Sequence, residues 1–318
     1  MDYKRIIGVD VAKDKLDVFD SKTQRHRVVV NSPDEINAFL LELKRARTRT
    51  LVVMEATGGY ESLLVEALET NGIACSVVNP LQIRNFARGC GMIEKNDKLD
   101  AHVIARFGEV VLPQLREIPT ESEKKLKALV HRRDQILSQI SAEQNRRQQT
   151  RDTEAKSMIE QAVTFYKTQI KAVDQRIGQV LNQCPDLAAK AEILQSCPGV
   201  GAATTGMLLS ELPELGKLNR GQVAKLVGVA PIAKDSGQKE GKRQTYAGRS
   251  MVRKVLYMAA LVATKYNSRM QAFYQRLLAK GKPKKVALVA VMRKLLVTLN
   301  EMIRNKQLWN EPSLAPID

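Results

Sequence analysis

The feature that most constrains the fold is a short apolar run near the start of the chain, residues 6–11, in which an aspartate interrupts aliphatic side chains. The aliphatic residues predict a buried strand. A carboxylate in such a strand is costly unless it is solvated, paired with a cation or bound to a metal, so Asp10 needs one of these environments. A second apolar run, residues 50–55, also ends in an acid, Glu55. The sequence therefore predicts two strands that each carry a carboxylate.

The segments around these strands alternate between strand-like and helix-like patterns over residues 1–110. Three short β-branched runs predict a meander. The pattern Ser32-Pro33-Asp34-Glu35 is typical of a helix start, and Gly58-Gly59 marks the end of the strand that carries Glu55. The predicted order is three strands, helix, strand, helix, strand, helix. This alternation is typical of an α/β layer fold.

Two further acids, Asp97 and Asp100, lie three residues apart in the closing helix, which places both carboxylates on one helix face. Two flanking lysines leave open the interpretation of a solvated surface pair. Together with Asp10 and Glu55 these acids make a set of four carboxylates, and hard divalent cations such as Mg2+ take oxygen ligands of this kind. Acids on the first strand, at the end of the fourth strand and on a late helix form an arrangement that resembles RNase H-like nucleases, including the RuvC resolvases.

The net charge of +17 is unevenly distributed along the chain. Residues 1–110 hold 16 basic and 16 acidic residues, whereas residues 191–308 hold 21 basic and 6 acidic ones. Such a basic segment indicates a polyanionic partner, because phosphate neutralisation supplies most non-specific affinity for nucleic acids. An anionic membrane surface is the second interpretation, but no run predicts a membrane span or a signal peptide. The four isolated cysteines favour a soluble, cytoplasmic protein without a zinc site.

The rest of the chain is predicted to be mainly α-helical. We expect an RNase H-like domain over residues 1–115, a helical coiled-coil linker over 116–190 with apolar residues at alternating steps of three and four, a basic helical domain over 191–308, and a tail over 309–318. Pro198-Gly199-Val200-Gly201 resembles the turn of helix-hairpin-helix DNA-binding motifs, whose free backbone amides can bind phosphate; a purely structural turn is the alternative.

A glycine-bracketed loop near residue 236 holds a single serine, Ser236, among basic residues. Loops of this composition are common, so the serine alone does not indicate catalysis. Basic residues in and after the loop are candidates for phosphate contacts. They are Lys239, Lys242, Arg243, Arg249, Arg253, Lys254, Lys284 and Lys285.

These motifs together resemble the insertion-sequence-one-hundred-and-ten family of transposases, which are DEDD recombinases guided by a bridge RNA. The resemblance is carried by Gly8-Val9-Asp10-Val11, by residues 54–60 and 95–101, by Pro198-Gly199-Val200-Gly201, and by residues 228–231 leading to Asp235-Ser236-Gly237. Asn96 stands where the family pattern has threonine. The resemblance implies that Asp10, Glu55, Asp97 and Asp100 bind Mg2+ in a RuvC-like domain, and that Ser236 is a nucleophile that forms a covalent bond to a DNA phosphate.

Ser236 lies far from the four acids in sequence, and the family resemblance implies an active site assembled between subunits. We expect a homo-oligomer, a dimer or a tetramer, that binds donor DNA, target DNA and a structured guide RNA. Two other functions are open at this point. One is a metal-dependent nuclease or junction resolvase in which water is the nucleophile. The other is a non-enzymatic protein that packages nucleic acid with its basic C-terminal third.

Overall fold

The computed structural model describes residues 3–46, 48–92, 97–113, 115, 119–232, 244–245 and 248–310, without the side chains of residues 97–99 and 244. The chain divides into two compact units, Met1–Ile118 and Pro119–Asp318. Each unit has its own hydrophobic core, and each is described by itself.

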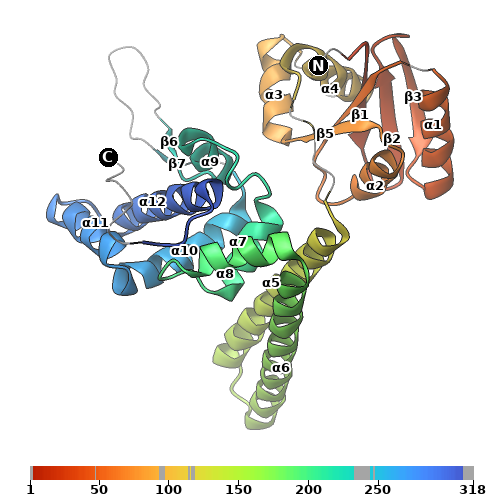
Figure 1. Ribbon diagram of the computed structural model, residues 1–318. Coiled ribbons are helices and arrows are strands. Elements are labelled where there is room, and N and C mark those ends of the chain that lie inside the picture. Colours follow the sequence, from red (N-terminus) through yellow and green to blue (C-terminus); the bar gives the residue numbers. More distant parts are fainter. Residues whose placement is uncertain are drawn as a thin grey trace. The chain divides into compact units, whose positions relative to one another are not determined.

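The first unit is built on a five-stranded mixed sheet (Figure 1). Its strand order is β3-β2-β1-β4-β5. β2 runs antiparallel to both of its neighbours, whereas β1, β4 and β5 are parallel. This order and these directions are those of the RNase H-like fold, so the predicted fold class is confirmed. The strands are β1 (Arg5–Val11), β2 (Lys15–Asp20), β3 (Arg25–Val30), β4 (Thr50–Glu55) and β5 (Ala74–Val78).

Helices cover both faces of this sheet, and the alternation of side chains along β1 sorts its residues between them. Ile7 and Val9 belong to the core under α1 and α2, whereas Ile6 belongs to the core under α3 and α4. Gly8 and Asp10 follow Ile6 in the alternation and therefore face α4. Figure 1 shows the two helix pairs on opposite sides of the sheet. The helices are α1 (Pro33–Arg45), α2 (Ser62–Thr70), α3 (Pro80–Gly89) and α4 (Asp97–Val111).

Helix α4 lies unusually close to β1. A Cβ atom added at Gly8 would lie 2.2 Å from the carbonyl oxygen of Ala101 and 2.4 Å from the amide nitrogen of Ala105. Two turns along the helix, a Cβ at Gly108 would lie 2.7 Å from the Cγ2 of Ile6. Real side chains cannot occupy such positions, so helix and strand approach this closely only because glycines stand at both contacts. The approach fixes α4, and its acids, against the strand that carries Asp10.

The second unit is helical and begins with a hairpin of two long helices, α5 (Glu121–Gln149) and α6 (Thr153–Gln183). Thr120 and Glu123 form a capping box at the start of α5. The chain leaves the helix between Gln149 and Thr153. The predicted apolar seam of α6 turns inward, with Val163, Val173 and Ile177 buried. The two arm helices thus pack on each other within one chain.

The hairpin of α5 and α6 and the remaining helices of the second unit share one hydrophobic core. Leu126 and Val130 of α5 and Ile177 of α6 cluster with side chains of the later helices. The helical arm therefore packs as part of the second unit, and the three-segment division of the chain stays a prediction. Within the described ranges, no helix has both the length and the apolar character needed to cross a bilayer. The later elements are α7 (Pro185–Gln195), α8 (Ala202–Glu211), α9 (Arg220–Val227), β6 (Pro231–Ile232), β7 (Gln244–Thr245), α10 (Ser250–Tyr266), α11 (Ser268–Ala279) and α12 (Lys284–Asn305).

The close approach of α4 to β1 predicts the effect of one methyl group. We expect Gly8→Ala to destabilise the first unit by roughly 1–3 kcal/mol or more, because backbone atoms of α4 must move to admit the new Cβ. Gly89→Ala in α3 is the matched control, since a Cβ there meets nothing within 4 Å, and its stability should be unchanged or slightly raised. Urea unfolding, with hydrogen exchange of the β1 and α4 amides, measures both. Equal stability of the two variants would contradict the close packing.

Candidate active site and nucleic-acid interface

Two of the predicted acids meet at the carboxyl edge of the sheet. The strands β1 and β4 are parallel, and Val9 pairs with Met54. The next residues along the two strands, Asp10 and Glu55, therefore emerge side by side. Both lie on the face that α4 covers, and both are half-buried. The positions of these two carboxylates follow directly from strand register.

The acid Asp100 joins this pair from α4. It precedes Ala101, whose carbonyl lies against Gly8, two residues before Asp10. The pKa of Glu55 is raised above its ordinary value, first by burial and then by the negative charges of Asp10 and Asp100. Glu55 is therefore close enough to both Asp10 and Asp100 for their charges to act on it. Asp97 is the first residue of α4, one helical turn before Asp100, but its side chain lies outside the described residues and its role stays a prediction.

A fifth carboxylate stands beside this group and was missed by the sequence analysis. Asp17 of β2 pairs directly with Asp10 of β1, so both point to the same face of the sheet. Asp17 is 3% exposed. It is held by His26, whose Nε2 lies 3.0 Å from its Oδ1, and by Lys15, whose Nζ lies 3.0 Å from its Oδ2. The only signal in the sequence is an acid at an alternating strand position, which is also the pattern of a solvent-facing strand.

Arg84 of α3 supplies the opposing charge, and it was also missed. Its positive charge partly offsets the effect of Asp10 and Asp100 on the pKa of Glu55. The adjacent Ile83 is buried in the core under α3 and α4, whereas Arg84 is exposed. Among the described residues, the guanidinium makes no hydrogen bond or ion pair. An arginine beside carboxylates that is not committed to a partner is suited to contact a phosphate.

The donor set at this edge fits a divalent cation by its chemistry. Asp10, Glu55 and Asp100 offer carboxylate oxygens, the ligands that hard divalent ions prefer. The pKa of Glu55 is raised first by burial and then by the charges of Asp10 and Asp100, and a cation among these acids would offset the repulsion. Among the side chains that the structure describes, no group of three or more acidic, histidine or cysteine residues forms a compact metal cluster. The fourth predicted ligand, Asp97, is outside that set.

The segment that contains Ser236 begins and ends in a two-stranded ladder. β6 pairs antiparallel with β7, with Pro231 opposite Thr245 and Ile232 opposite residue 244. Residues 233–243 between these strands, which include Ser236, Lys239, Lys242 and Arg243, lie outside the described residues. The structure therefore locates the two ends of the predicted nucleophile loop. The roles of those four residues stay predictions.

The base of this loop is fixed to the end of α9. Gly248 has a left-handed φ of 80°, and a Cβ there would lie 2.4 Å from the amide nitrogen of Gly228. The amide of Arg249 donates to the carbonyl of Leu226 at 3.2 Å, and the guanidinium of Arg253 donates to the carbonyl of Val227 at 3.1 Å. The chain that leaves β7 is thus anchored on the last turn of α9.

Three of the predicted phosphate contacts take part in ion pairs or hydrogen bonds inside the second unit. Arg249 binds the carboxylate of Glu214 through two hydrogen bonds of 2.6 Å. Arg253 holds the end of α9, and Lys254 pairs with Asp134 at 2.5 Å. These contacts give each residue a structural part, and their contacts to nucleic acid stay predictions.

The other predicted phosphate contacts lie at helix starts. Lys284 and Lys285 are exposed in the first turn of α12. The turn before α8 is held by Asn267, whose Nδ2 donates to the carbonyl of Pro198 at 3.4 Å, and by the close contact of Gly199 with Ala263. Gly201, the N-cap of α8, is exposed and has no side-chain cap, so backbone amides at that helix start face solvent. This arrangement is compatible with the predicted phosphate-binding turn.

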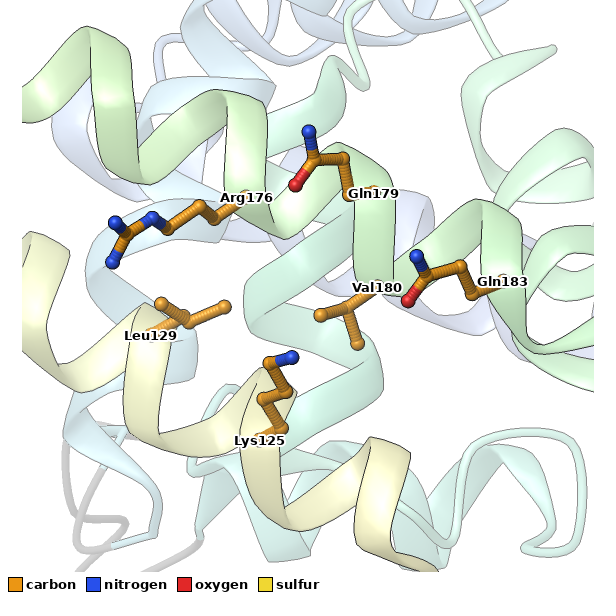
Figure 2. A pocket seen from close by; sticks show the side chains of 6 residues that line it. All are labelled: Lys125, Leu129, Arg176, Gln179, Val180 and Gln183. Atoms are coloured by element: carbon orange, nitrogen blue, oxygen red, sulfur yellow. The ribbon is translucent and has the colours of Figure 1, made fainter.

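A shallow pocket of about 220 Å³ lies between α5 and α6 (Figure 2). It contains no carboxylate, thiol or imidazole, and therefore no group for acid–base or nucleophilic chemistry at neutral pH. The pocket is a gap in the helical hairpin, not a second active site. Its lining consists of Lys125, Leu129, Arg176, Gln179, Val180 and Gln183.

Comparisons with known proteins agree along most of the chain. A family model described as a transposase matches residues 7–152, and a second, described as the transposase IS116/IS110/IS902 family, matches residues 191–275. A pilin gene-inverting protein of Moraxella lacunata is 30% identical over 314 residues, which cover 96% of this chain and 97% of that protein. An uncharacterized 44.8 kDa protein of insertion element IS116 from Streptomyces clavuligerus is 28% identical over 148 residues, 44% of this chain and 37% of that protein.

One solved structure is similar to part of the chain. It is T. thermophilus RuvC in complex with a Holliday junction substrate, with 19% sequence identity and a TM-score of 0.27. The match covers 36% of this chain and 99% of the RuvC chain. At this TM-score the match adds nothing to what the strand order of the sheet already shows.

The pair of Glu214 and Arg249 predicts a dependence of stability on pH. Burial alone would raise the pKa of Glu214, but the hydrogen bonds and charge of Arg249 outweigh it, and the pKa lies below its ordinary value of 4.5. A lowered folded-state pKa stabilises the unit above the unfolded value, and this contribution is lost as the pH falls. We expect the free energy of unfolding to fall more steeply between about pH 6 and about pH 3 in the wild type than in Glu214→Gln. If the free energies of unfolding, measured with urea, fall equally with pH in the wild type and in Glu214→Gln, this prediction is contradicted.

Proposed function

The chain belongs to the IS116/IS110/IS902 family of transposases, and on this premise we propose that it cuts and rejoins the DNA strands of an insertion element with a serine nucleophile and a carboxylate-held divalent metal. The observation that carries the proposal is the meeting of Asp10, Glu55 and Asp100 at one edge of an RNase H-like sheet. Three acids that repel one another are poorly suited to bind a polyanion by themselves, and a cation among them removes this difficulty.

The four acids Asp10, Glu55, Asp97 and Asp100 would hold the metal, which we propose to be Mg2+. When bound, the metal would neutralise charge on the phosphoryl oxygens and favour the ionised form of an attacking hydroxyl. Asp17, buried and paired with His26, adds negative charge next to Asp10 without facing solvent. Arg84, whose charge lowers the pKa of Glu55, would be a cation for a substrate phosphate.

We propose that Ser236 is the nucleophile. Its hydroxyl oxygen would attack the phosphorus of a DNA phosphodiester, the bond to the leaving sugar oxygen would break, and that oxygen would take up a proton. A sugar hydroxyl of another strand would then attack the phosphoserine and return the serine, so that one phosphodiester is exchanged for another without an external energy source. The pairing of β6 with β7 supports this role because it fixes both ends of the loop.

The competing proposal is a nuclease or resolvase in which water attacks the phosphate and Ser236 is structural. The name of the relative from Moraxella lacunata favours recombination, since a protein that inverts a gene must rejoin the strands that it cuts. That relative matches nearly the whole chain, including the part that contains Ser236. A hydrolase would release free DNA ends and would not conserve the phosphodiester bond for rejoining.

Two further parts of the proposal rest on the family resemblance. One is a structured bridge RNA that chooses donor and target DNA, for which the basic C-terminal third supplies electrostatic attraction. The other is assembly of the active site between subunits of a dimer or tetramer, in which the loop of one chain completes the acidic edge of another. The nucleic acid that copurifies with the full chain, identified by sequencing, tests the first.

The metal site predicts a change in stability that needs no substrate. Mg2+ at a hundred times its Kd should stabilise the first unit by about 2.7 kcal/mol. Thermal unfolding should show this shift in the wild type and in the control Glu109→Gln, whose exposed acid lies on the same helix, but not in Asp10→Asn combined with Glu55→Gln. Without metal, Glu55→Gln should be more stable than the wild type because the repulsion at that position is removed. A metal shift that persists in the double variant would exclude this site.

The serine nucleophile predicts a covalent intermediate. Labelled element-end DNA incubated with the full chain and Mg2+ should give a retarded band on a denaturing gel, and Ser236→Ala should abolish the band. Asp10→Asn should abolish it as well, because the acidic edge is needed for the attack. An adduct that survives Ser236→Ala would eliminate the serine, and cleavage without an adduct would support water as the nucleophile.

The same gel reports whether the active site is shared between chains. A mixture of Ser236→Ala and Asp10→Asn chains contains intact acids on one chain and an intact loop on the other. If the site forms between subunits, the mixture should recover adduct formation that neither variant shows alone. No recovery in a mixture that forms oligomers of the wild-type size would contradict assembly in trans.

A further inference from the structure

The loop that follows Glu55 presents an aromatic ring to solvent. Tyr60 is 52% exposed and lies five residues after Glu55, at the carboxyl edge of the sheet. Among the described residues, its ring makes no contact with another ring or with a cation. Single exposed aromatic residues are ordinary on protein surfaces, so exposure alone indicates nothing. What distinguishes Tyr60 is how firmly the loop around it is held.

The loop is organised around the carboxylate of Glu61. Its Oε2 accepts hydrogen bonds from the amide of Thr57 at 3.2 Å, from the hydroxyl of Thr57 at 3.0 Å and from the amide of Gly59 at 2.9 Å. Burial would raise the pKa of Glu61, but these hydrogen bonds outweigh it and lower the pKa, so the carboxylate stays ionised. Gly58 and Gly59 adopt φ values of 76° and 121°. A short loop with this many internal contacts is ordered before any ligand binds.

A second contact ties the loop to the other acid-bearing strand. The side-chain amide of Asn31 donates to the carbonyl of Tyr60 at 3.2 Å and to the carbonyl of Ala12 at 3.0 Å. Ala12 stands two residues after Asp10. The backbone of Tyr60 is therefore linked to the segments that follow both β1 and β4. A Cβ at Gly58 or Gly59 would meet nothing within 4 Å, so there is open space at these two positions of the loop.

An exposed aromatic ring in an ordered loop that follows an acid-bearing strand has a specific use in nucleic-acid chemistry. Carboxylates repel the phosphate backbone, so a contact to a base adds to the contacts that hold a strand near them. Stacking of a base on an aromatic side chain is such a contact, and it tolerates any base because each has a π-face. Preorganisation of the loop reduces the entropy lost on binding. A protein partner would need a larger apolar patch than the one ring of Tyr60, so a protein is a poorer fit to this site than a nucleobase.

We propose that the loop of residues 56–61 is a nucleotide-binding site in which the base next to the reacting phosphate stacks on Tyr60, while Glu61 and Asn31 are positioning residues that hold the ring in place. The proposal rests on the proposed function, because it assumes that a DNA strand passes the edge formed by Asp10 and Glu55. It adds the chemical class of the ligand, an unpaired nucleobase, and the residue that receives it.

Fluorine NMR on the full chain labelled with fluorotyrosine tests the stacking directly. Glu55→Gln keeps the DNA uncut, and Tyr60→Phe in a parallel sample assigns the Tyr60 signal. A single-stranded oligodeoxynucleotide should shift that signal, whereas an abasic oligomer of equal length, with the same phosphates, should not. Tyr266, exposed in α10 of the second unit, is the control tyrosine. A Tyr60 signal that does not respond, or that responds equally to the abasic oligomer, overturns the proposal.

Affinity measured by fluorescence anisotropy gives the second arm. Tyr60→Ala should weaken binding of the base-containing oligomer at the loop of residues 56–61 by about five- to a hundredfold. Binding of the abasic oligomer should be unchanged. Tyr60→Phe should retain the wild-type affinity, because stacking needs the ring and not the hydroxyl. A loss in Tyr60→Phe as large as that in Tyr60→Ala overturns stacking.

A double-mutant cycle tests the positioning role. Glu61→Ala should weaken binding when Tyr60 is present and have little further effect in a Tyr60→Ala background, since the loop then holds no ring. Additive losses would overturn the positioning role of Glu61. These measurements need no catalysis, so they separate two failures. If the Tyr60 signal responds to DNA but no DNA is cleaved, the proposed recombinase chemistry is wrong and the stacking site stands. If Asp10-dependent cleavage occurs without a Tyr60 response, the stacking site is wrong and the recombinase chemistry stands.

Discussion

The close contact between α4 and β1 is the interaction on which the candidate active site depends. Gly8 lets the backbone of the helix reach the strand, and the fully buried Ala101 and Ile104 fill the interface. Burial of an isoleucine side chain such as that of Ile104 stabilises the contact by roughly 1.5–3 kcal/mol, and the methyl group of Ala101 contributes less. The same approach places the start of α4, with Asp100, next to the strand that carries Asp10. The pKa of Glu55 is raised first by burial and then by the charges of Asp10 and Asp100, so packing holds these acids at an electrostatic cost. The sheet holds its acids in an arrangement that they would not adopt by themselves.

The basic second unit uses part of its charge for its own structure. Arg249 binds Glu214, Arg253 holds the carbonyl at the end of α9, and Lys254 pairs with Asp134. Of these, Arg249 and Arg253 belong to the segment that follows β7, at the base of the loop that contains Ser236. A count of basic residues thus overstates the charge available to nucleic acid. Arg249 and Arg253 instead hold the segment that follows β7 against Glu214 and against the end of α9.

Much of the first unit could be predicted from the sequence because its signals are local. The apolar runs of β1 and β4 predict two strands that each carry an acid, and strand register then places Asp10 next to Glu55. The residues that were missed depend on pairings between distant segments. Asp17 looks like a solvent-facing strand residue until β2 is paired with β1. Arg84 looks like a surface residue until α3 is placed beside the end of β4. The partners of Arg249 are likewise set by tertiary contacts.

The shared core of the second unit has a consequence for dividing the gene into separately expressed parts. The first family model ends at residue 152, between α5 and α6, whereas the first compact unit ends at residue 118. A fragment that ends at residue 152 would contain α5 but lack the helices that bury Leu126, Val130 and Ile136. The exposed apolar side chains would then promote aggregation. A cut at residue 118 leaves each hydrophobic core whole. Expression of the two halves as soluble fragments is therefore governed by the core and not by sequence similarity.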